Sequence, residues 1–290
     1  MTRKMAYNPL SFYFTPEGFR SDAAPPLTEI LSVVRDTGYD GIHSAIPVGS
    51  TPQDYLALLK QYDLVPAPGY FQASFADTEK LPDTINTARR LAGDHARLGL
   101  DRVFIAEAFG VAPERTEKPG LGVGGSEERL SRIVEGLAKV ASAMVSEGIV
   151  PCLHPHIGTR IETGDEADFI LNRISAKDLL VGPDTGHLSW AGADLTDFIL
   201  RHSGRIGAVH IKDYRKPVAD QGMTYTAANK ASIWTEPGRG SIDLEGAIKA
   251  LGSFEGWFVV EVDIADQPTV PESARVAAEW LRPRLSLGRQ

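Results

Sequence analysis

The 290-residue sequence contains a single cysteine, Cys152, and lacks any apolar run long enough to cross a bilayer. One cysteine excludes a disulfide within the chain and favours a reducing compartment. Because Cys152 lies in an apolar strand-like run, we expect a buried core residue rather than a nucleophile. A membrane-spanning helix needs about 20 apolar residues, and the N-terminal segment lacks the apolar core of a signal peptide. We therefore expect a cytoplasmic protein that does not associate with membranes.

Positive charge is also in short supply. The chain has 30 Lys and Arg against 38 Asp and Glu, so its net charge is −8 and its pI is about 5.4. This balance argues against non-specific nucleic-acid binding, which depends on basic surfaces. We therefore expect a small-molecule partner and no nucleic acid.

Apolar runs alternate with amphipathic segments along the chain. The predicted strands cover residues 5–14, 41–46, 64–70, 102–107, 150–154, 179–183, 206–211 and 257–262. The predicted helices cover residues 25–37, 51–62, 82–98, 126–147, 165–174, 195–200, 242–251 and 271–281. Eight strand–helix units without a linker rich in Pro, Gly or Ser predict a single (β/α)8 TIM barrel domain over residues 1–290.

Two long connections interrupt this alternation, at residues 108–125 and 214–240. The first contains PGLGVGG and is polar or rich in glycine throughout. It lacks the Lys-Ser/Thr ending of a phosphate-binding P-loop. A long loop at the carboxyl end of a strand is usually a lid or a substrate loop, so we predict a flexible segment there.

Polar residues occur where the predicted strands end. Residues two apart share a face of a strand, which predicts that Glu107, His154, Asp184, His210 and Glu261 point into the barrel mouth from five consecutive strands. The apolar residues between them are expected to face the helices, namely Phe104, Leu153, Val209, Ile211, Val260 and Val262. TIM barrels place their chemistry at this end of the strands.

Each of these residues also has a purely structural interpretation. Asp184 is able to cap the following turn, and His210 to be a hydrogen-bonded core histidine. Glu261, inside WFVVEVD, needs a metal, Lys or Arg beside it, since a buried carboxylate without a partner is costly. Carboxylate oxygens mixed with histidine nitrogens suit a divalent cation, either Mn²⁺, our first expectation, or Co²⁺, Mg²⁺, Zn²⁺ or Fe²⁺.

Six stretches carry a resemblance to a known family: IAEAFG at 105–110, LHPHIGTRIET at 153–163, PDTGHLSWAGAD at 183–194, GRIGAVHIKDYR at 204–215, EPGRGSID at 236–243 and GWFVVEVD at 256–263. In their order and spacing the chain resembles the xylose-isomerase-like barrel superfamily, which includes sugar isomerases and epimerases, dehydroshikimate dehydratases and the endonuclease IV fold. Within it, the chain is most similar to inosose (2-keto-myo-inositol) dehydratases. The resemblance spans nearly the whole second half and is weak before residue 100.

The resemblance implies a set of metal ligands. The superfamily's metal-binding Asp, His and Glu on strands six to eight fall on Asp184, His210 and Glu261. The ligand on the fifth strand, commonly Glu in the isomerases, falls on His154. Whether His154, His156 or Glu107 completes the shell stays open.

The resemblance also implies substrate contacts. His187 matches a position close to the metal and substrate, and Lys212 and Arg215 match the basic end of the seventh strand, which contacts substrate oxygens. The chain departs from the family at His43, where an acidic residue is usual. It departs from the inosose dehydratases after the third strand, where it has Gly69 or Tyr70 and they tend to carry a lysine. These positions line the mouth, so they bear on substrate choice.

Aromatic residues offer a further hypothesis. They are candidates for walls that stack on a sugar ring, with ordinary packing as the equal alternative: Tyr7, Phe12, Tyr13, Phe14, Tyr70, Phe71 and Trp190.

Family members often form homo-oligomers, and nothing in this sequence specifies one.

The strand-end residues predict metal-assisted removal of a proton next to a ketone, through an enediolate. The resemblance to inosose dehydratases implies that the reaction is the dehydration of a keto-cyclitol or keto-sugar by a metal-dependent lyase. Glu107, His154 or Glu261 would remove the α-proton, and His156 or His187 would protonate the leaving hydroxyl. The same parts suit a sugar isomerase or epimerase, or a lyase that cleaves 3-keto-glycosides. An endonuclease-IV-like phosphodiesterase is disfavoured by the charge, and a sugar-binding barrel is the non-enzymatic alternative.

Overall fold

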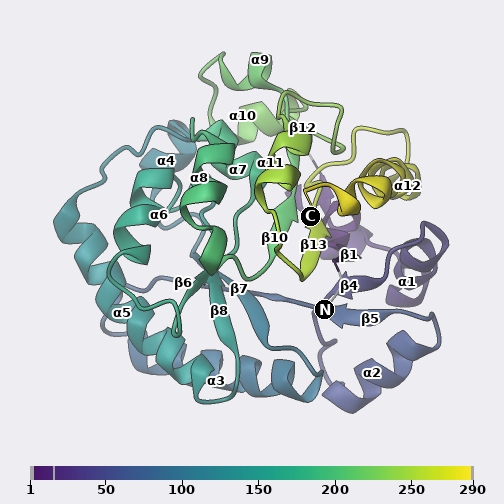
Figure 1. The fold of residues 1–290 in the computed structure, drawn as a ribbon, viewed down its shortest axis with the longest axis horizontal. Coiled ribbons are helices and arrows are strands. Elements are labelled where there is room, and N and C mark those ends of the chain that lie inside the picture. The colour runs from purple at the N-terminus through teal and green to yellow at the C-terminus, as the bar shows by residue number, and fades with distance from the viewer. Residues whose placement is uncertain (1–2, 16, 289–290) are drawn as a thin grey trace.

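Parallel pairing joins the predicted strands into a closed ring (Figure 1). The computed structural model describes residues 3–15 and 17–288. One sheet has the order β10-β13-β1-β4-β5 and the other β6-β7-β8-β9. Bridges at Val181–Ile206 and Asp184–His210 join the segment of β9 to that of β10. The described residues form the predicted α/β barrel, while the predicted domain over 1–290 also includes residues 1–2, 16 and 289–290, which lie outside them.

Most barrel strands are shorter than the apolar runs that predict them, whereas the strand Arg102–Glu107 has the predicted bounds. The barrel strands are β1 (Lys4–Tyr7), β4 (Gly41–His43), β5 (Val65–Ala67), β6 (Tyr70–Ala73), β7 (Arg102–Glu107), β8 (Val150–Leu153), β9 (Leu180–Val181), β10 (Val209–Ile211) and β13 (Trp257–Val260). Two antiparallel ribbons lie outside the ring: β2 (Phe14–Thr15) with β3 (Gly18–Phe19), and β11 (Asp213–Tyr214) with β12 (Trp234–Thr235).

Helices surround the strands (Figure 1). The larger ones are α1 (Leu27–Asp36), α2 (Pro52–Lys60), α3 (Leu81–Arg97), α5 (Glu127–Val145), α6 (Gly164–Leu171), α8 (Leu195–Arg201), α11 (Leu244–Ala250) and α12 (Val270–Leu281). Shorter ones are α4 (Pro113–Glu117), α7 (Thr185–Trp190), α9 (Lys216–Ala219) and α10 (Tyr225–Lys230). The 3-10 helices are η1 (Pro9–Phe12), η2 (Ser21–Ala23), η3 (Ser203–Arg205) and η4 (Arg282–Ser286). Among the described residues, no helix is both long and apolar enough to span a membrane.

Two of the predicted strands are interrupted, each at a proline. The first was expected to reach Phe14, but the chain turns into η1 at Pro9, which has no N–H for a strand ladder. The third divides into β5, which pairs with β4, and β6, which pairs with β7, around Pro68 and Gly69. A Cβ at Gly69 would lie 2.4 Å from the Ser44 carbonyl oxygen, so this crossing needs glycine.

The barrel has an inner and an outer apolar layer. The inner layer consists of Ala6, Ala67, Phe104, Cys152, Ala208 and Val259. The layer between strands and helices includes Val103, Ile105, Leu153, Val209, Ile211, Val260 and Val262. This confirms the predicted faces of β8, β10 and β13 and the burial of Cys152. The prediction for β7 was wrong, because Phe104 points inward and Val103 and Ile105 face the helices.

The connection at residues 108–125, predicted as a flexible loop, holds a short helix and a buried ion pair. It contains α4, and the buried Glu162 carboxylate accepts hydrogen bonds from the N–H groups of Gly120 and Gly122. The Arg115 guanidinium, fully buried, pairs with Glu162 and Glu166 at 2.9 and 2.6 Å. Glycine serves here to bring backbone N–H groups to one carboxylate. The segment is therefore anchored to the start of α6.

Candidate metal centre

Four side chains from four consecutive barrel strands meet at the carboxyl end of the barrel. His154 follows β8, Asp184 follows β9, His210 lies in β10 and Glu261 follows β13. Ligand atoms of His154, Asp184 and His210 lie within 4.8 Å of one another, and so do those of Asp184, His187 and Glu261. All five residues are buried. The structure thus brings together the four predicted metal ligands, whose role in metal binding stays a prediction.

Asp184 combines two local functions. It is the N-cap of α7, and its Oδ1 accepts a hydrogen bond from the His187 N–H at 2.8 Å. Its Oδ2 is buried and has no hydrogen-bond partner. The capping role considered from the sequence therefore occupies one oxygen and leaves the other facing the cluster.

The two histidines of the cluster also present unsatisfied nitrogens. Both ring nitrogens of His210 are buried without a hydrogen bond, although Nδ1 lies 3.1 Å from Glu261 Oε2 and 3.6 Å from Asp184 Oδ2. His154 Nδ1 lies 3.2 Å from the Gly182 carbonyl oxygen, so it donates there and Nε2 keeps its lone pair. Buried polar atoms normally have partners. A divalent cation with mixed O and N ligands would satisfy these atoms.

Lys212 lies at the centre of the charges in this site. Its fully buried ammonium is 2.7 Å from Glu261 Oε1, 2.7 Å from Asp263 Oδ1 and 3.0 Å from His187 Nε2. The sequence predicts Lys212 as a substrate contact, whereas its ammonium is engaged by these side chains. Asp263 is absent from the predicted site, although its position two residues after Glu261 was a signal that it shares that face.

Burial and charge oppose each other in the pKa values of the cluster. Burial raises the pKa of Glu261, but Lys212 and His210 outweigh it and hold the pKa well below the ordinary value. Burial lowers the pKa of His210, but Glu261 and Asp184 raise it to about 9. For Asp263 burial prevails over Lys212 and raises the pKa to about 6. The site is therefore anionic enough to retain an imidazolium without a metal.

The other histidines near the cluster are neutral. Burial lowers the pKa of His43 to about 3 and that of His156 to about 4, and it takes the pKa of His187 well below the ordinary value. His156 Nδ1 lies 2.7 Å from the Ile157 carbonyl oxygen, so it donates there and Nε2 carries the lone pair. The rings of His156 and His187 lie 3.8 Å apart.

A cavity of about 480 Å³ opens onto the cluster. Its lining consists of Asn8, Leu10, Phe14, Phe19, His43, Tyr70, Gln72, Phe109, His154, His156, Tyr225, Glu261 and Asp263. Two of the predicted aromatic walls, Phe14 and Tyr70, are among them. The cavity is large enough for an organic ligand.

Comparison with known proteins supplies the family. The family model described as xylose isomerase-like TIM barrel matches residues 31–284. The chain belongs to this family. The inosose dehydratase of Klebsiella pneumoniae (strain 342) is 29% identical over 270 residues, which are 86% of this chain and 88% of that protein. The inosose dehydratase of Geobacillus thermodenitrificans (strain NG80-2) is 35% identical over 144 residues, 48% of each chain.

A solved structure shows the same fold. The IOLI protein, whose crystal structure has a zinc atom bound, is 16% identical with a TM-score of 0.71 and covers 98% of both chains. Because its relatives include inosose dehydratases, this xylose isomerase-like protein is an enzyme of the superfamily.

Three predicted site residues of this xylose isomerase-like enzyme lie away from the cavity. Glu107 faces the helices, where it accepts a hydrogen bond from the Phe75 N–H at 3.2 Å. The prediction that it points into the mouth was wrong, because the alternation of β7 starts on the opposite face. Trp190 stacks on Tyr225 with ring centres 5.8 Å apart. Arg215 pairs with the carboxylate of Asp266.

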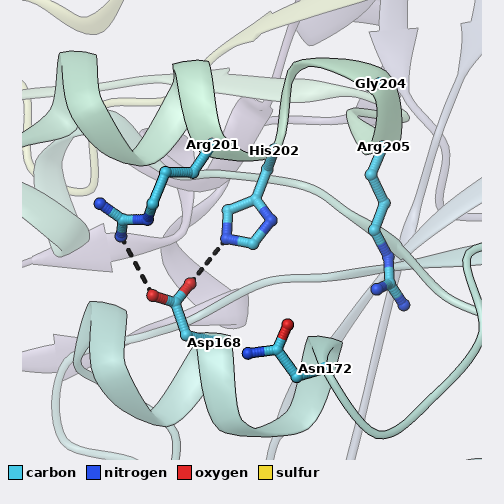
Figure 2. Close-up of a pocket in the computed structure, with 6 residues that line it drawn as sticks. All are labelled: Asp168, Asn172, Arg201, His202, Gly204 and Arg205. Atoms are coloured by element: carbon cyan, nitrogen blue, oxygen red, sulfur yellow. Dashed lines mark hydrogen bonds and ion pairs between the residues drawn. The ribbon is translucent and has the colours of Figure 1, made fainter.

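A separate hollow of about 490 Å³ lies on the outer surface between α6 and α8 (Figure 2). Asp168 pairs there with Arg201 at 3.1 Å and with His202 at 2.6 Å. The Arg205 guanidinium donates to backbone carbonyls, including that of Leu179 at 2.9 Å. The charged groups of this hollow are paired with one another or with backbone carbonyls, and they hold α6 and α8 together. The candidate site of the enzyme is therefore the barrel mouth.

Proposed function

We propose that the protein is a divalent-metal-dependent dehydratase that acts on a keto-cyclitol or keto-sugar. The observation that carries this proposal is the pair of buried ligand atoms that make no hydrogen bond, Asp184 Oδ2 and His210 Nε2, beside the cavity-lining residues His154 and Glu261. The relatives named inosose dehydratase support the reaction class and the cyclitol substrate.

His154, Asp184, His210 and Glu261 would hold the cation. When bound, it supplies Lewis-acid stabilisation of the negative charge that develops on the oxygen of the substrate carbonyl. The oxygen and nitrogen ligands suit Mn²⁺ first, and also Co²⁺, Mg²⁺, Zn²⁺ or Fe²⁺.

His156 would accept the α-proton of the substrate. Its side chain lines the cavity, and the hydrogen bond from Nδ1 to Ile157 leaves Nε2 free to take a proton. Glu261 serves less well as the base, because it is one of the residues that would hold the cation and Lys212 lies 2.7 Å from its Oε1. Glu107 lies outside the cavity lining.

The Lys212–Asp263 pair would complete the elimination. Asp263 lines the cavity, and Lys212 donates to it at 2.7 Å. The pair is thus placed to pass a proton to the leaving hydroxyl. The α C–H and β C–O bonds break, a C=C bond forms, and water leaves. If a proton returns to the former carbonyl carbon instead, the same residues would perform an isomerisation, and if it returns to the α-carbon from the opposite face they would perform an epimerisation.

Asp184→Asn tests the metal site with little disturbance of the fold. The amide oxygen of Asn keeps the cap on the His187 N–H, while the amide NH₂ replaces Oδ2 and cannot bind a cation. Asp194→Asn is the matched control, because Asp194 caps α8 in the same way, through the Asp197 N–H. Metal content is measured beside turnover of 2-keto-inositol by proton NMR, with Mn²⁺ added.

We expect about one divalent ion per chain and release of water from 2-keto-inositol in the wild type and in Asp194→Asn, with both lost in Asp184→Asn. Metal binding with ketose interconversion alone would assign the enzyme to the isomerases or epimerases. Absence of both metal and turnover would overturn the proposal and leave a sugar-binding barrel.

A further inference from the structure

The cavity above the candidate metal centre has two parts of different chemistry. Its polar part consists of His43, His154, Glu261 and Asp263, which are buried, and His156, which is half-buried. Its outer part is aromatic and consists of Phe14, Phe19, Phe109 and Tyr225, which we call the aromatic rim. A polyol ring needs hydrogen-bond partners for its hydroxyls, and only the polar part is rich in them. The function proposed above leaves the rim unexplained.

The rim is assembled from segments far apart in the chain. The β2–β3 ribbon pairs Phe14 with Phe19 and sets their ring centres 6.2 Å apart. Gly18, with a φ of +124°, allows the ribbon to turn back at this point. Phe109 follows β7, and its ring centre lies 5.1 Å from Tyr225 and 5.9 Å from His156. The rim therefore begins directly beside the proposed proton acceptor.

Two aromatic rings of the rim are exposed to solvent at the cavity, which is unfavourable for apolar side chains. Phe19 is 59% exposed and Phe109 is 43% exposed, although both line the cavity. Aromatic side chains are usually buried, and clustered exposed ones mark binding surfaces. The volume of about 480 Å³ also lies within the range of roughly 300–1,000 Å³ that holds drug-sized ligands, which is generous for a single polyol ring.

We propose that the substrate of this enzyme carries an aromatic or other apolar substituent, which lies against Phe19 and Phe109 while the keto ring occupies the polar part. The identity of the keto ring rests on the proposed function, whereas the apolar subsite rests on the rim alone. Continuity of the rim with the polar part favours one ligand spanning both. A second copy of the chain covering the rim is the competing occupant.

The test uses binding as well as turnover. Affinities of 4-nitrophenyl glucoside and methyl glucoside, which lack the ketone, are measured by calorimetry on Mn²⁺-loaded protein. Turnover is then measured on 4-nitrophenyl and methyl 3-keto-glucosides. The variants are Phe19→Ala and Phe109→Ala, and the matched control is Leu200→Ala, an exposed apolar residue on α8. The mass of each protein is followed by sedimentation.

The wild type and Leu200→Ala should prefer the aryl over the methyl glucoside by about tenfold, the value expected of one good aromatic contact. Phe19→Ala and Phe109→Ala should lower this ratio at least about threefold and leave the methyl affinity unchanged. Equal affinities in the wild type would overturn the inference. The inference would also be overturned if Phe19→Ala and Phe109→Ala lost self-association but kept the aryl preference, because the rim would then bind a second copy of the chain. An aryl preference without turnover would retain the subsite and exclude these 3-keto-glucosides as substrates, and the proposed function would then be decided by the assay on 2-keto-inositol.

Discussion

The Lys212 ammonium lies 2.7 Å from Glu261 Oε1, and both side chains are almost entirely buried. Asp263 approaches the same ammonium at 2.7 Å from the strand-end residue two positions later. One lysine thus compensates two carboxylates in a place where unpaired charges are costly. Glu261, expected from the sequence to need a metal, Lys or Arg beside it, has Lys212 in that place even without a metal.

Lys212→Met is therefore expected to destabilise the metal-free protein by about 3–5 kcal/mol, because it leaves buried carboxylates without their cation. The same change removes one positive charge from the cluster, so the affinity for Mn²⁺ should rise. Urea unfolding with EDTA and Mn²⁺ titration measure the two effects. The control Lys216→Met removes an exposed lysine paired with Asp220 and should leave both unchanged. A stable metal-free Lys212→Met protein would contradict this account.

Metal binding should stabilise the folded state. A ligand that binds only the native protein, at 100 times its Kd, adds about 2.7 kcal/mol to the free energy of unfolding. We expect a stabilisation of this size when Mn²⁺ is added to the wild type and its loss on addition of EDTA. Asp184→Asn should unfold identically in both conditions. Thermal unfolding measures the difference, and a response of Asp184→Asn equal to that of the wild type would place the cation elsewhere.

Glu107 gives a pH dependence that is independent of the metal. Burial raises its pKa from 4.5 to about 7, although the Phe75 N–H and Arg160 favour its charged form. The folded protein therefore holds a proton that the unfolded chain releases above pH 4.5. The free energy of unfolding should fall as pH rises through this window, by at most about 3 kcal/mol.

Glu107→Gln should remove this dependence. Below pH 4.5 the free energy of unfolding of the variant and that of the wild type should change with pH in the same way. From pH 4.5 to about pH 7 the free energy of unfolding of the variant should rise relative to that of the wild type. Urea unfolding from pH 4 to 8 measures the difference. Glu128→Gln, at an exposed site on α5, serves as the control and should follow the wild type at every pH. A constant offset between Glu107→Gln and the wild type would disprove the raised pKa.

Strand alternation predicts part of the site because β8, β10 and β13 are regular. It places His154, His210 and Glu261 on one inner face, as observed. On β7 the alternation fails as a guide. Apolar residues line both faces of a barrel strand, so only the polar Glu107 was available to decide which residues face inward, and it indicated the wrong face. Phe104 belongs to the interior, where its ring lies 4.0 Å from that of His210. Side-chain type alone does not distinguish the two faces.

The long connections could not be predicted for a different reason. Trp190 stacks on Tyr225, and Arg215 pairs with Asp266, a residue beyond the eighth strand. These partners are distant in sequence, and local patterns contain no information about such pairings. The short helix α7 was also missed, since its six residues give too few turns for an apolar period. The stretches that carried the family resemblance lie mostly at strand ends, while EPGRGSID at 236–243 overlaps the second long connection.

Glu162 offers a last prediction, about the connection at residues 108–125. Its carboxylate accepts hydrogen bonds from Arg115 at 2.9 Å and from the N–H groups of Gly120, Gly122 and Gly158 at 3.2, 2.9 and 2.9 Å. Glu162→Gln replaces one of the two acceptor oxygens with an NH₂ donor. It also removes one of the two negative charges, those of Glu162 and Glu166, that balance the buried Arg115 guanidinium. We expect a loss of about 3 kcal/mol of stability, since the group is buried and charged.

The loss should be concentrated in the connection, because its anchor is removed while the barrel strands keep their pairing. Limited trypsin digestion should therefore cleave Glu162→Gln after Arg115 faster than the wild type, and hydrogen exchange should quicken at Gly120 and Gly122. Glu117→Gln, an exposed change in the same connection, should behave as the wild type. Unchanged protection at Gly120 in Glu162→Gln would show that the fold holds this segment without the carboxylate, for example through its backbone turns.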